Sequence, residues 1–235
     1  MVLTGAGVSA ESGVLTFRGA GGLWKQFRPE ELATPEAFAR DPRLVWEWYA
    51  MRRDTVIACE PNAAHRAMAS FALTRGAMTI VTQNVDGLHA RAARAVAASG
   101  DATAAMPLEL HGSILRDRCS ECDARSEPVP VDASSAATLP RCAHCGGPLR
   151  PDVVWFGEML DHEVLSAADD AAAHADVCLV VGTSALVYPA ASLPLRTRSR
   201  GGAIIEVNPE ETSLSDVAEV SIRGSAAAVV PGLLD

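Results

Sequence analysis

Lysine is almost absent from this chain of 235 residues: Lys25 is the only one, and arginine supplies the rest of the side-chain positive charge. Acidic residues outnumber lysine and arginine by 29 to 20, which gives a formal net charge of −9. An acidic surface repels phosphate backbones, so the composition argues against non-specific binding of DNA or RNA, although local basic patches are compatible with it. We expect no direct nucleic-acid partner.

Long apolar runs are also missing. No apolar segment approaches the roughly 18 residues that identify a membrane-spanning helix, and the run at 177–181 is typical of the longest. The N-terminus shows no basic segment followed by an apolar one with a cleavage site, as a secretory signal would. We therefore expect a cytoplasmic protein that does not bind membranes. Its 49% hydrophobic residues predict an ordinary globular core.

Short apolar segments alternate with helical ones along most of the chain. Strands are predicted at residues 2–4, 78–82, 177–181, 203–207 and 217–222, and helices at 61–75, 162–174 and 189–200. This alternation predicts an α/β fold, a Rossmann-like parallel sheet with helices on both faces. Ligands bind beyond the carboxyl ends of such strands, where Gly5, Gln83, Gly182 and Asn208 would lie.

Two stretches interrupt the alternation and predict a small second module, made of a helical insertion and a zinc ribbon. One stretch is rich in tryptophan, and the other carries paired cysteines and a loop rich in proline, serine and alanine. A cleft between module and sheet is the expected active-site location. We assign residues 1–24, 67–115 and 150–235 to the Rossmann-type domain, 25–66 to the helical part of the small domain, and 116–149 to its zinc-ribbon part.

Four of the six cysteines form two Cys-x-x-Cys pairs, a spacing typical of a zinc ribbon. Each pair supplies two thiolates from one tight turn, so the two pairs would close a tetrahedron around one structural Zn²⁺ with no open position. Cys178 lies within a predicted strand and Cys59 has no evident partner, so neither is expected to bind metal. The predicted ligands are Cys119, Cys122, Cys142 and Cys145.

A glycine-rich turn, GAGVSAESG at residues 5–13, follows the first predicted strand. Glycines allow the backbone to approach a phosphate, and the start of a following helix favours the anion. The segment lacks a glycine that the ordinary dinucleotide fingerprint requires, and a simple tight turn is the alternative interpretation.

Polar residues follow the second predicted strand in TQNVDGLH, residues 82–89, and a histidine lies in LHG, residues 110–112. Amide and carboxylate side chains there can hydrogen-bond a ligand that carries a carboxamide. A lone histidine such as His111 is more often structural than catalytic, so both roles stay open. Tyr49 and Arg52 share one face of a predicted helix. By itself, that helix favours a half-buried Tyr49 and a solvated Arg52.

Taken together, these motifs resemble the sirtuins, the NAD-dependent protein lysine deacylases, over nearly the whole chain. The matching segments are GAGVSAESG, TFRG, TQNVDGLH, LHG, the two cysteine pairs, VVWFGE, GTSALVYPA and EVNPE. Three of these segments, GAGVSAESG, TFRG and VVWFGE, together with the residues around them, resemble the class III branch of the family. This branch removes succinyl, malonyl and glutaryl groups. The resemblance implies NAD as co-substrate and acylated-lysine proteins or peptides as substrates. It leaves the oligomeric state open.

The resemblance also implies where NAD binds and how it reacts. The acyl-lysine amide oxygen would displace nicotinamide at the ribose, and His111 would act as general base on a ribose hydroxyl that attacks the resulting imidate. Water would then release free lysine and 2′-O-acyl-ADP-ribose. The expected cofactor-binding residues are Gly5, Ala6, Gly7, Ser9, Glu11, Ser12, Phe17, Arg18, Trp24, Gln83, Asn84, Asp86, Gly182, Thr183, Ser184, Asn208, Glu210 and Ala226.

A Tyr-x-x-Arg pair implies the acyl specificity. Arg52 would bind an acyl carboxylate with two hydrogen bonds, Tyr49 would add a third, and the small Ala33 would leave room for the longer chain. An acetyl group would also fit. Segments 156–158 and 186–188 match those that pair with the substrate backbone. The expected substrate-binding residues are Ala33, Tyr49, Arg52, Val154, Phe156, Gly157, Glu158, Leu186 and Tyr188.

Two features depart from the family. The chain starts at Met1, almost inside the first strand and without the upstream helix common in the family, so we expect a weaker sheet beside the cofactor loop. Leu15 stands where the family usually has proline, which frees the backbone of the covering loop and predicts weaker NAD ordering.

Two other functions are compatible with parts of the sequence. A non-catalytic zinc-ribbon module that binds nucleic acid or protein predicts basic and aromatic residues around the cysteines, but residues 116–150 mix arginines with acidic residues such as Asp117 and Glu121. A protein ADP-ribosyltransferase of the same fold would also consume NAD, and the intact Tyr49 and Arg52 pair favours deacylation over it.

Overall fold

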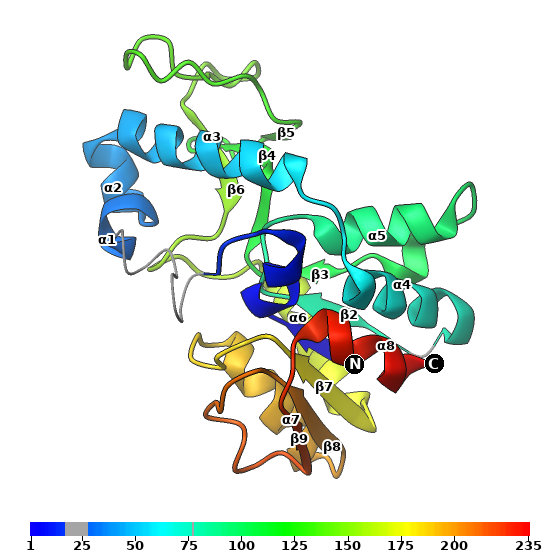
Figure 1. The fold of residues 1–235 in the computed structure, drawn as a ribbon. Coiled ribbons are helices and arrows are strands. Elements are labelled where there is room, and N and C mark those ends of the chain that lie inside the picture. The colour runs from blue at the N-terminus through cyan, green and yellow to red at the C-terminus, as the bar shows by residue number, and fades with distance from the viewer. Residues whose placement is uncertain (17–27, 77) are drawn as a thin grey trace.

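The computed structural model describes residues 1–16, 28–76 and 78–235. Phe17, Arg18 and Trp24, which the resemblance assigns to the cofactor, lie outside these residues. Figure 1 shows a larger sheet surrounded by helices and a smaller sheet with helices of its own. The fold is the α/β architecture with a small second module that the sequence predicts.

The larger sheet consists, in the described residues, of β1 (Val2–Thr4), β2 (Ile80–Thr82), β3 (Leu108–Glu109), β7 (Val177–Val181), β8 (Ala203–Val207) and β9 (Val220–Ile222). These strands are parallel and follow the order β3-β2-β1-β7-β8-β9. The chain leaves β1 toward β2 and β3 and returns on its other side with β7. The strand order therefore reverses between β1 and β7.

Helices cover both faces of this sheet. On one face lie α4 (Ala63–Arg75), α5 (Leu88–Ala97) and α8 (Ala226–Leu234), and on the other α6 (His162–His174) and α7 (Leu193–Ser199). Within β1, Val2 packs against the first group and Leu3 against the second. This alternation follows from the two-residue period of a strand, and both side chains are apolar because both faces of the sheet are buried.

The strands at β7 and β8 match the predicted residues one by one, whereas β2 and β9 are shorter than predicted. The strand β3 was not predicted, because two residues are too few to show a period. β1 lies in the middle of the sheet, and Val2 and Leu3 are fully buried there.

Capping residues set where the helices begin. The Asn62 side chain accepts hydrogen bonds from the backbone N–H groups of Ala64 and His65, so α4 starts two residues later than predicted. Asp161 caps α6 in the same way, and that helix matches its predicted range. The helix predicted at 189–200 is α7 preceded by a short 3-10 helix, Ala190–Ser192.

In the part of the chain that the structure describes, the small module joins three helices to a second sheet. The helices are α1 (Pro29–Leu32), α2 (Pro35–Arg40) and α3 (Pro42–Ala58), and the antiparallel strands, in the order β5-β4-β6, are β4 (Gly112–Cys119), β5 (Arg125–Ser126) and β6 (Leu149–Val153). Two of the predicted domain boundaries fall inside β4 and β6, and the division into domains stays a prediction.

Helix α3 is fastened to the smaller sheet by buried polar contacts. Arg53 Nη2 lies 2.6 Å from Asp117 Oδ1, and Arg53 Nε donates to the Ile114 carbonyl oxygen over 2.8 Å. The Trp46 indole donates to the Leu149 carbonyl oxygen over 3.1 Å. These contacts fix the rotation of α3 about its axis, and with it the direction in which its other side chains point.

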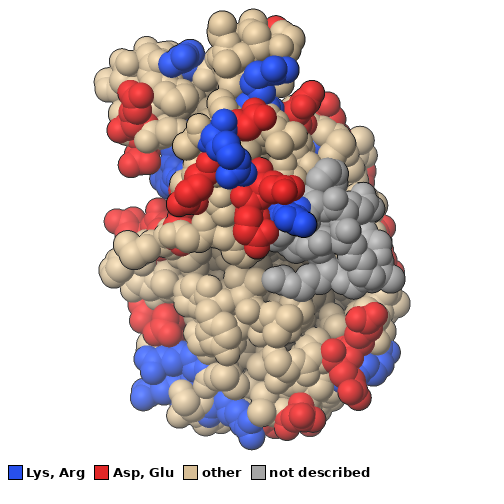
Figure 2. Space-filling model, turned by 90° about the vertical axis from the view of Figure 1, so that its left-hand side faces the viewer, with Lys and Arg blue, Asp and Glu red and all other residues tan. Residues whose placement is uncertain are grey.

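The surface carries a mixture of charges. Figure 2 shows acidic and basic side chains interspersed on one face of the molecule. Within the described part of the chain, no helix combines the length and apolar character needed to cross a membrane.

Candidate active site

A cavity of about 1120 Å³ lies between the larger sheet and the small module. Its walls come from the turns after β1, β2, β7 and β8, from α3, and from the segment after β6. It includes the point between β1 and β7 where the strand order reverses, which is the usual ligand site of such sheets. The cleft expected between module and sheet is therefore present.

Gly5 and Gly7 bring the turn after β1 into backbone contact with the turn after β7. The Gly7 N–H donates to the Gly182 carbonyl oxygen over 2.8 Å, and a Cβ on Gly7 would lie 2.7 Å from the Gly182 Cα. Gly182 has a φ of +61°, and a Cβ there would lie 2.4 Å from the Val8 backbone nitrogen. A side chain at Gly7 or Gly182 would push the two turns apart, so this wall of the cavity depends on glycine.

Hydrogen bonds behind this wall join the first turn to the turn after β2. The buried Ser9 hydroxyl donates to Asp86 Oδ2 over 2.7 Å and accepts from Asn84 Nδ2 over 3.2 Å. Burial raises the pKa of Asp86, although these contacts and the Leu88 N–H oppose the shift. Asn84 lines the cavity, whereas Ser9, Asp86 and Ser12 do not.

Two buried histidines extend this network, and neither was singled out from the sequence. His65 Nε2 lies 3.3 Å from the Ser9 hydroxyl, and His89 Nε2 lies 2.9 Å from the Thr4 hydroxyl. Burial lowers the pKa of His65 to about 4 and that of His89 well below its usual value, so both imidazoles are neutral at pH 7. They contribute hydrogen bonds rather than charge to the floor of the site.

His111 lies between β3 and β4, where the chain passes from the larger sheet to the smaller one. Its Nδ1 lies 2.9 Å from the Gln83 carbonyl oxygen. A carbonyl only accepts, so Nδ1 carries the hydrogen and Nε2 keeps a lone pair. Burial lowers the pKa of His111, and the bond to Gln83 only partly opposes this. A neutral imidazole in the cavity wall can accept a proton, as a general base must.

Several of the polar residues predicted to bind the cofactor lie on the side of β7 and β8. Gln83 Nε2 donates to the Thr183 hydroxyl over 3.0 Å. Glu11 accepts from the Ser225 hydroxyl over 2.8 Å and from the Ala227 N–H over 2.7 Å, which caps α8. The predicted cofactor residues that line the cavity are Gly5, Ala6, Gly7, Glu11, Gln83, Asn84, Gly182, Thr183, Ser184, Asn208, Glu210 and Ala226.

Glu206, which the sequence did not reveal, orders the loop that follows β8. Its buried carboxylate accepts hydrogen bonds from Thr212, from Ser215 over 2.7 Å, from Ser221 over 3.0 Å and from Arg223 over 2.9 Å. Burial acts to raise the pKa of Glu206, but these donors outweigh it and keep the pKa below its usual value. The loop so held lines part of the cavity, at residues 208–213.

Tyr49 and Arg52 line the opposite end of the cavity with Ala33. Tyr49 is 2% exposed and Arg52 is 8% exposed, so the half-buried tyrosine and solvated arginine of an isolated amphipathic helix are not what the fold produces. The Arg52 guanidinium carbon lies 4.6 Å from the centre of the Trp48 ring. Burial lowers the pKa of Arg52, and the nearby Tyr49 and Asp86 raise it. A buried guanidinium in a cavity wall favours an anionic ligand.

Four further residues line this end of the cavity, and the sequence motifs did not identify them as part of the site. Trp48, Val85, Val153 and Trp155 line the cavity there. Trp155 belongs to the VVWFGE segment, and Trp48 directly precedes the Tyr-x-x-Arg pair. This closeness to the predicted motifs was the signal in the sequence that could have indicated them.

The segments predicted to pair with a peptide border the same cavity. The Phe156 N–H donates to the Ala33 carbonyl oxygen over 2.9 Å, which ties the segment after β6 to the small module. Leu186 and Tyr188 are 58% and 71% exposed although they are apolar or aromatic. The predicted substrate-binding residues that line the cavity are Ala33, Tyr49, Arg52, Val154, Phe156, Gly157, Glu158, Leu186 and Tyr188.

The paired cysteines come together at the far end of the smaller sheet. Their four Sγ atoms all lie within 4.8 Å of one another, with 3.4 Å between Cys119 and Cys145 and 3.8 Å between Cys122 and Cys142. A tetrahedron with Zn–S bonds of about 2.3 Å has edges of about 3.8 Å, so the four thiols fit one Zn²⁺. Backbone N–H groups of Glu121, His144 and Gly147 lie 3.4 Å from three of the sulfurs.

Comparisons with known proteins agree with one another. The model of the Sir2 family matches residues 5–189 of this chain. The NAD-dependent protein deacylase 1 of Archaeoglobus fulgidus is 50% identical over 235 residues, which cover 100% of this chain and 91% of that protein.

Solved structures match this chain over nearly its whole length. A Sir2 homologue in complex with NAD is 49% identical, and its TM-score is 0.85 over 100% of this chain and 87% of that one. A complex of Sir2 with a p53 peptide and NAD⁺ is 29% identical, with a TM-score of 0.83 over 99% of this chain and 90% of that one.

Proposed function

The chain belongs to the Sir2 family, and from this premise we propose that it removes acidic acyl groups, succinyl and malonyl, from protein lysines. It is an NAD-dependent protein deacylase that releases nicotinamide and 2′-O-acyl-ADP-ribose. NAD is its co-substrate, and one Zn²⁺ is its structural metal. Acylated proteins or peptides are its substrates.

One observation carries the proposed acyl preference: Arg52 is a buried cation in the wall of the cavity. Burying a guanidinium is costly in free energy, and a carboxylate that accepts two hydrogen bonds from it would offset that cost. Tyr49 lies in the same wall and adds a hydroxyl group. An acetyl group has no carboxylate to offer, so it would fit the space without gaining this stabilisation.

The rest of the cavity suits NAD. Glycines border it at the turns after β1 and β7, and polar side chains border it beside β8. NAD supplies a ribose carbon from which nicotinamide can leave. His111 Nε2 is the proton acceptor for a ribose hydroxyl, since the Gln83 carbonyl holds the ring in the tautomer that leaves this nitrogen unprotonated.

The zinc site contributes structure rather than chemistry, because four thiolates fill the coordination sphere. β4 ends at Cys119 and begins one residue after His111. The metal therefore holds the strand that leads away from the proposed base.

A comparison of matched peptides tests the acyl preference. Peptides that differ only in a succinyl, malonyl or acetyl group on one lysine are incubated with NAD and the native protein, Arg52→Met or His111→Ala. Loss of a charged hydrogen-bond pair costs about 1.5–3 kcal/mol, so Arg52→Met is expected to lower kcat/KM for succinyl-lysine by roughly 10- to 100-fold while acetyl-lysine changes little.

The outcomes separate the parts of this proposal. An unchanged succinyl-to-acetyl ratio in Arg52→Met contradicts the role of Arg52 in specificity. Full activity of His111→Ala contradicts the proton-transfer role. Transfer of ADP-ribose onto protein with no release of acyl groups would indicate an ADP-ribosyltransferase instead.

A cytoplasmic location, the lack of a nucleic-acid partner and the roles of the individual site residues are further parts of this proposal. The acidic net charge supports the lack of a nucleic-acid partner. Fractionation of cells and a filter-binding assay with DNA and RNA would test them.

A further inference from the structure

The Tyr49 hydroxyl has a partner that fixes its orientation. The indole Nε1 of Trp155 lies 2.9 Å from the Tyr49 hydroxyl oxygen, and both side chains are almost completely buried. An indole N–H can only donate, so the Tyr49 oxygen accepts this hydrogen bond. We propose that Trp155 is a positioning residue for acyl specificity, because it directs the Tyr49 hydroxyl hydrogen away from itself and toward an acidic acyl group. This inference rests on the acyl preference proposed above.

The direction of that hydrogen follows from the donor inventory. A phenol has one hydrogen to donate, and it cannot point at another donor. Among the described residues, the Tyr49 hydroxyl donates no hydrogen bond, and its neighbour Arg52 in the cavity wall is itself a donor. Burial raises the pKa of Tyr49, so the phenol keeps its hydrogen at neutral pH. An acyl carboxylate is the acceptor that would complete this arrangement.

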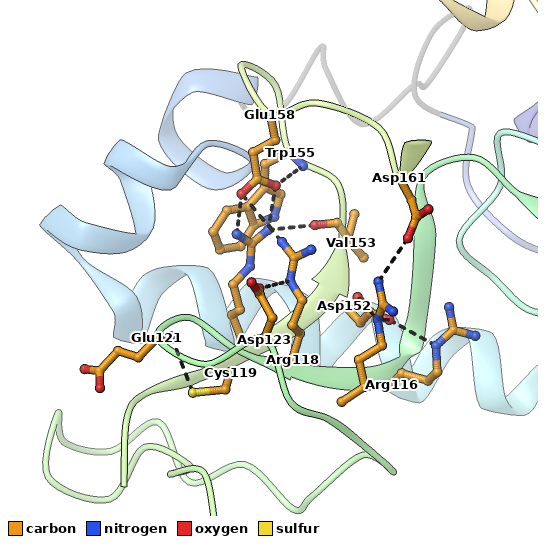
Figure 3. Close-up of polar contacts among 12 residues, drawn as sticks. Arg116, Arg118, Cys119, Glu121, Asp123, Asp152, Val153, Trp155, Glu158 and Asp161 are labelled. Atoms are coloured by element: carbon orange, nitrogen blue, oxygen red, sulfur yellow. Dashed lines mark hydrogen bonds and ion pairs between the residues drawn. The ribbon is translucent and has the colours of Figure 1, made fainter. Parts of the chain in front are cut away.

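Trp155 is itself held from the side of the smaller sheet. The guanidinium carbon of Arg150, on β6, lies 3.3 Å from the centre of the Trp155 ring. Arg150 also forms a two-pronged ion pair with Glu158, one arm of which, from Nη2 to Oε2, is 2.8 Å long. Glu158 Oε2 in turn accepts the Trp155 backbone N–H over 2.7 Å, as Figure 3 shows. The backbone and the ring of Trp155 are thus both fixed.

These contacts connect β6 to the end of the cavity that Tyr49 and Arg52 line. Arg150 orients Glu158 and stacks on Trp155, and Trp155 orients Tyr49. Phe38 packs against Trp155 from another side, with ring centres 5.4 Å apart, but it offers no polar group. Among the described residues, the Trp155 N–H is the hydrogen-bond donor to the Tyr49 hydroxyl, so the polar and the packing roles of this ring can be separated by substitution.

Trp155→Phe keeps an aromatic ring and removes the N–H. A hydrogen bond between neutral groups contributes about 1 kcal/mol, so the succinyl-to-acetyl ratio of kcat/KM is expected to fall about five-fold. Tyr49→Phe is expected to lower the same ratio at least as much, because it removes the hydroxyl itself. In the double variant Trp155→Phe/Tyr49→Phe, the ratio is expected to equal that of Tyr49→Phe alone.

Two further variants keep this test decisive. Phe38→Leu removes an aromatic neighbour of Trp155 but leaves the N–H, and it is expected to leave the ratio within about two-fold while lowering Tm. If Trp155→Phe does not fold, 3-benzothienylalanine at position 155 serves instead, since this analogue has the shape of tryptophan and lacks the N–H.

The result distinguishes this inference from the proposed function. A native protein without preference for succinyl-lysine over acetyl-lysine overturns the proposed function. A native preference that Trp155→Phe leaves intact overturns only the positioning role. Equal losses with both peptides, or independent effects of the two substitutions in the double variant, show that Trp155 serves packing alone.

Discussion

The buried ion pair between Arg53 and Asp117 makes a strong prediction about stability. Asp117 is completely buried, and its Oδ2 also accepts the Val129 backbone N–H over 2.8 Å. Replacing Arg53 by methionine would keep much of the side-chain volume and leave the Asp117 carboxylate buried without its counter-ion. We expect Arg53→Met to destabilise the protein strongly, because an uncompensated buried charge is one of the costliest single changes in a fold.

The magnitude follows from the burial of both groups. Breaking a buried ion pair on one side costs about 3–5 kcal/mol. For a chain of this size, each kcal/mol lowers Tm by about 2–4 °C, so the expected shift is roughly 6–20 °C. The ion pair also fixes α3, which carries Tyr49 and Arg52, so the activity toward succinyl-lysine should fall at temperatures below the new Tm.

Thermal unfolding followed by circular dichroism measures this shift, with two variants as controls. Arg43→Met removes an exposed arginine of the same helix, which donates to the Ala133 carbonyl oxygen, and should change stability by less than about 0.5 kcal/mol. The double variant Arg53→Met/Asp117→Leu removes both charges and should recover most of the loss. Equal shifts for Arg53→Met and Arg43→Met, or no recovery in the double variant, would refute this reasoning.

Three further predictions concern the two ends of the cavity. The imidazole of His111 must be neutral to accept a proton, and burial lowers its pKa from 6.5. A plot of kcat/KM against pH should therefore rise with a midpoint below 6.5. A midpoint above 6.5 would contradict the role of His111 as general base. Leu15→Pro restricts the backbone of the covering loop and should strengthen NAD binding, measured by calorimetry. Equal NAD affinities of Leu15→Pro and the native protein would contradict this effect of Leu15. Glu206→Gln weakens the hold of a charged acceptor on Arg223 and three hydroxyls, so KM for NAD should rise about ten-fold while KM for the peptide stays constant; parallel rises in both would point to a general loss of structure.

Local features of the sequence predicted much of the fold. Strands such as Val177–Val181 are continuous apolar runs followed by glycine, and the cysteine pairs have a spacing that only a compact turn explains. The glycines at 5, 7 and 182 mark the two turns that meet. In each case the pattern lies within a few neighbouring residues, and such local patterns predict strands and turns directly.

The remainder depended on contacts between distant parts of the chain. Tyr49 and Trp155 are 106 positions apart, and neither residue alone indicates that they share a hydrogen bond. Ser9 and Asp86 were expected at the cofactor, but they bond to each other behind the cavity wall instead of lining it. The burial of Arg52 likewise depends on how α3 is rotated against the smaller sheet. The spacing of apolar residues along the helix does not predict this rotation.

The side-chain ion pairs in residues 1–16, 28–76 and 78–235 all use arginine as the cation. Acylation removes the charge of a lysine side chain, whereas arginine is not a substrate for that modification. Acylation of lysine therefore cannot neutralise the cations that contact α3, Trp155 and the loop after β8. The modification that this deacylase reverses therefore leaves the cation of each of these ion pairs charged.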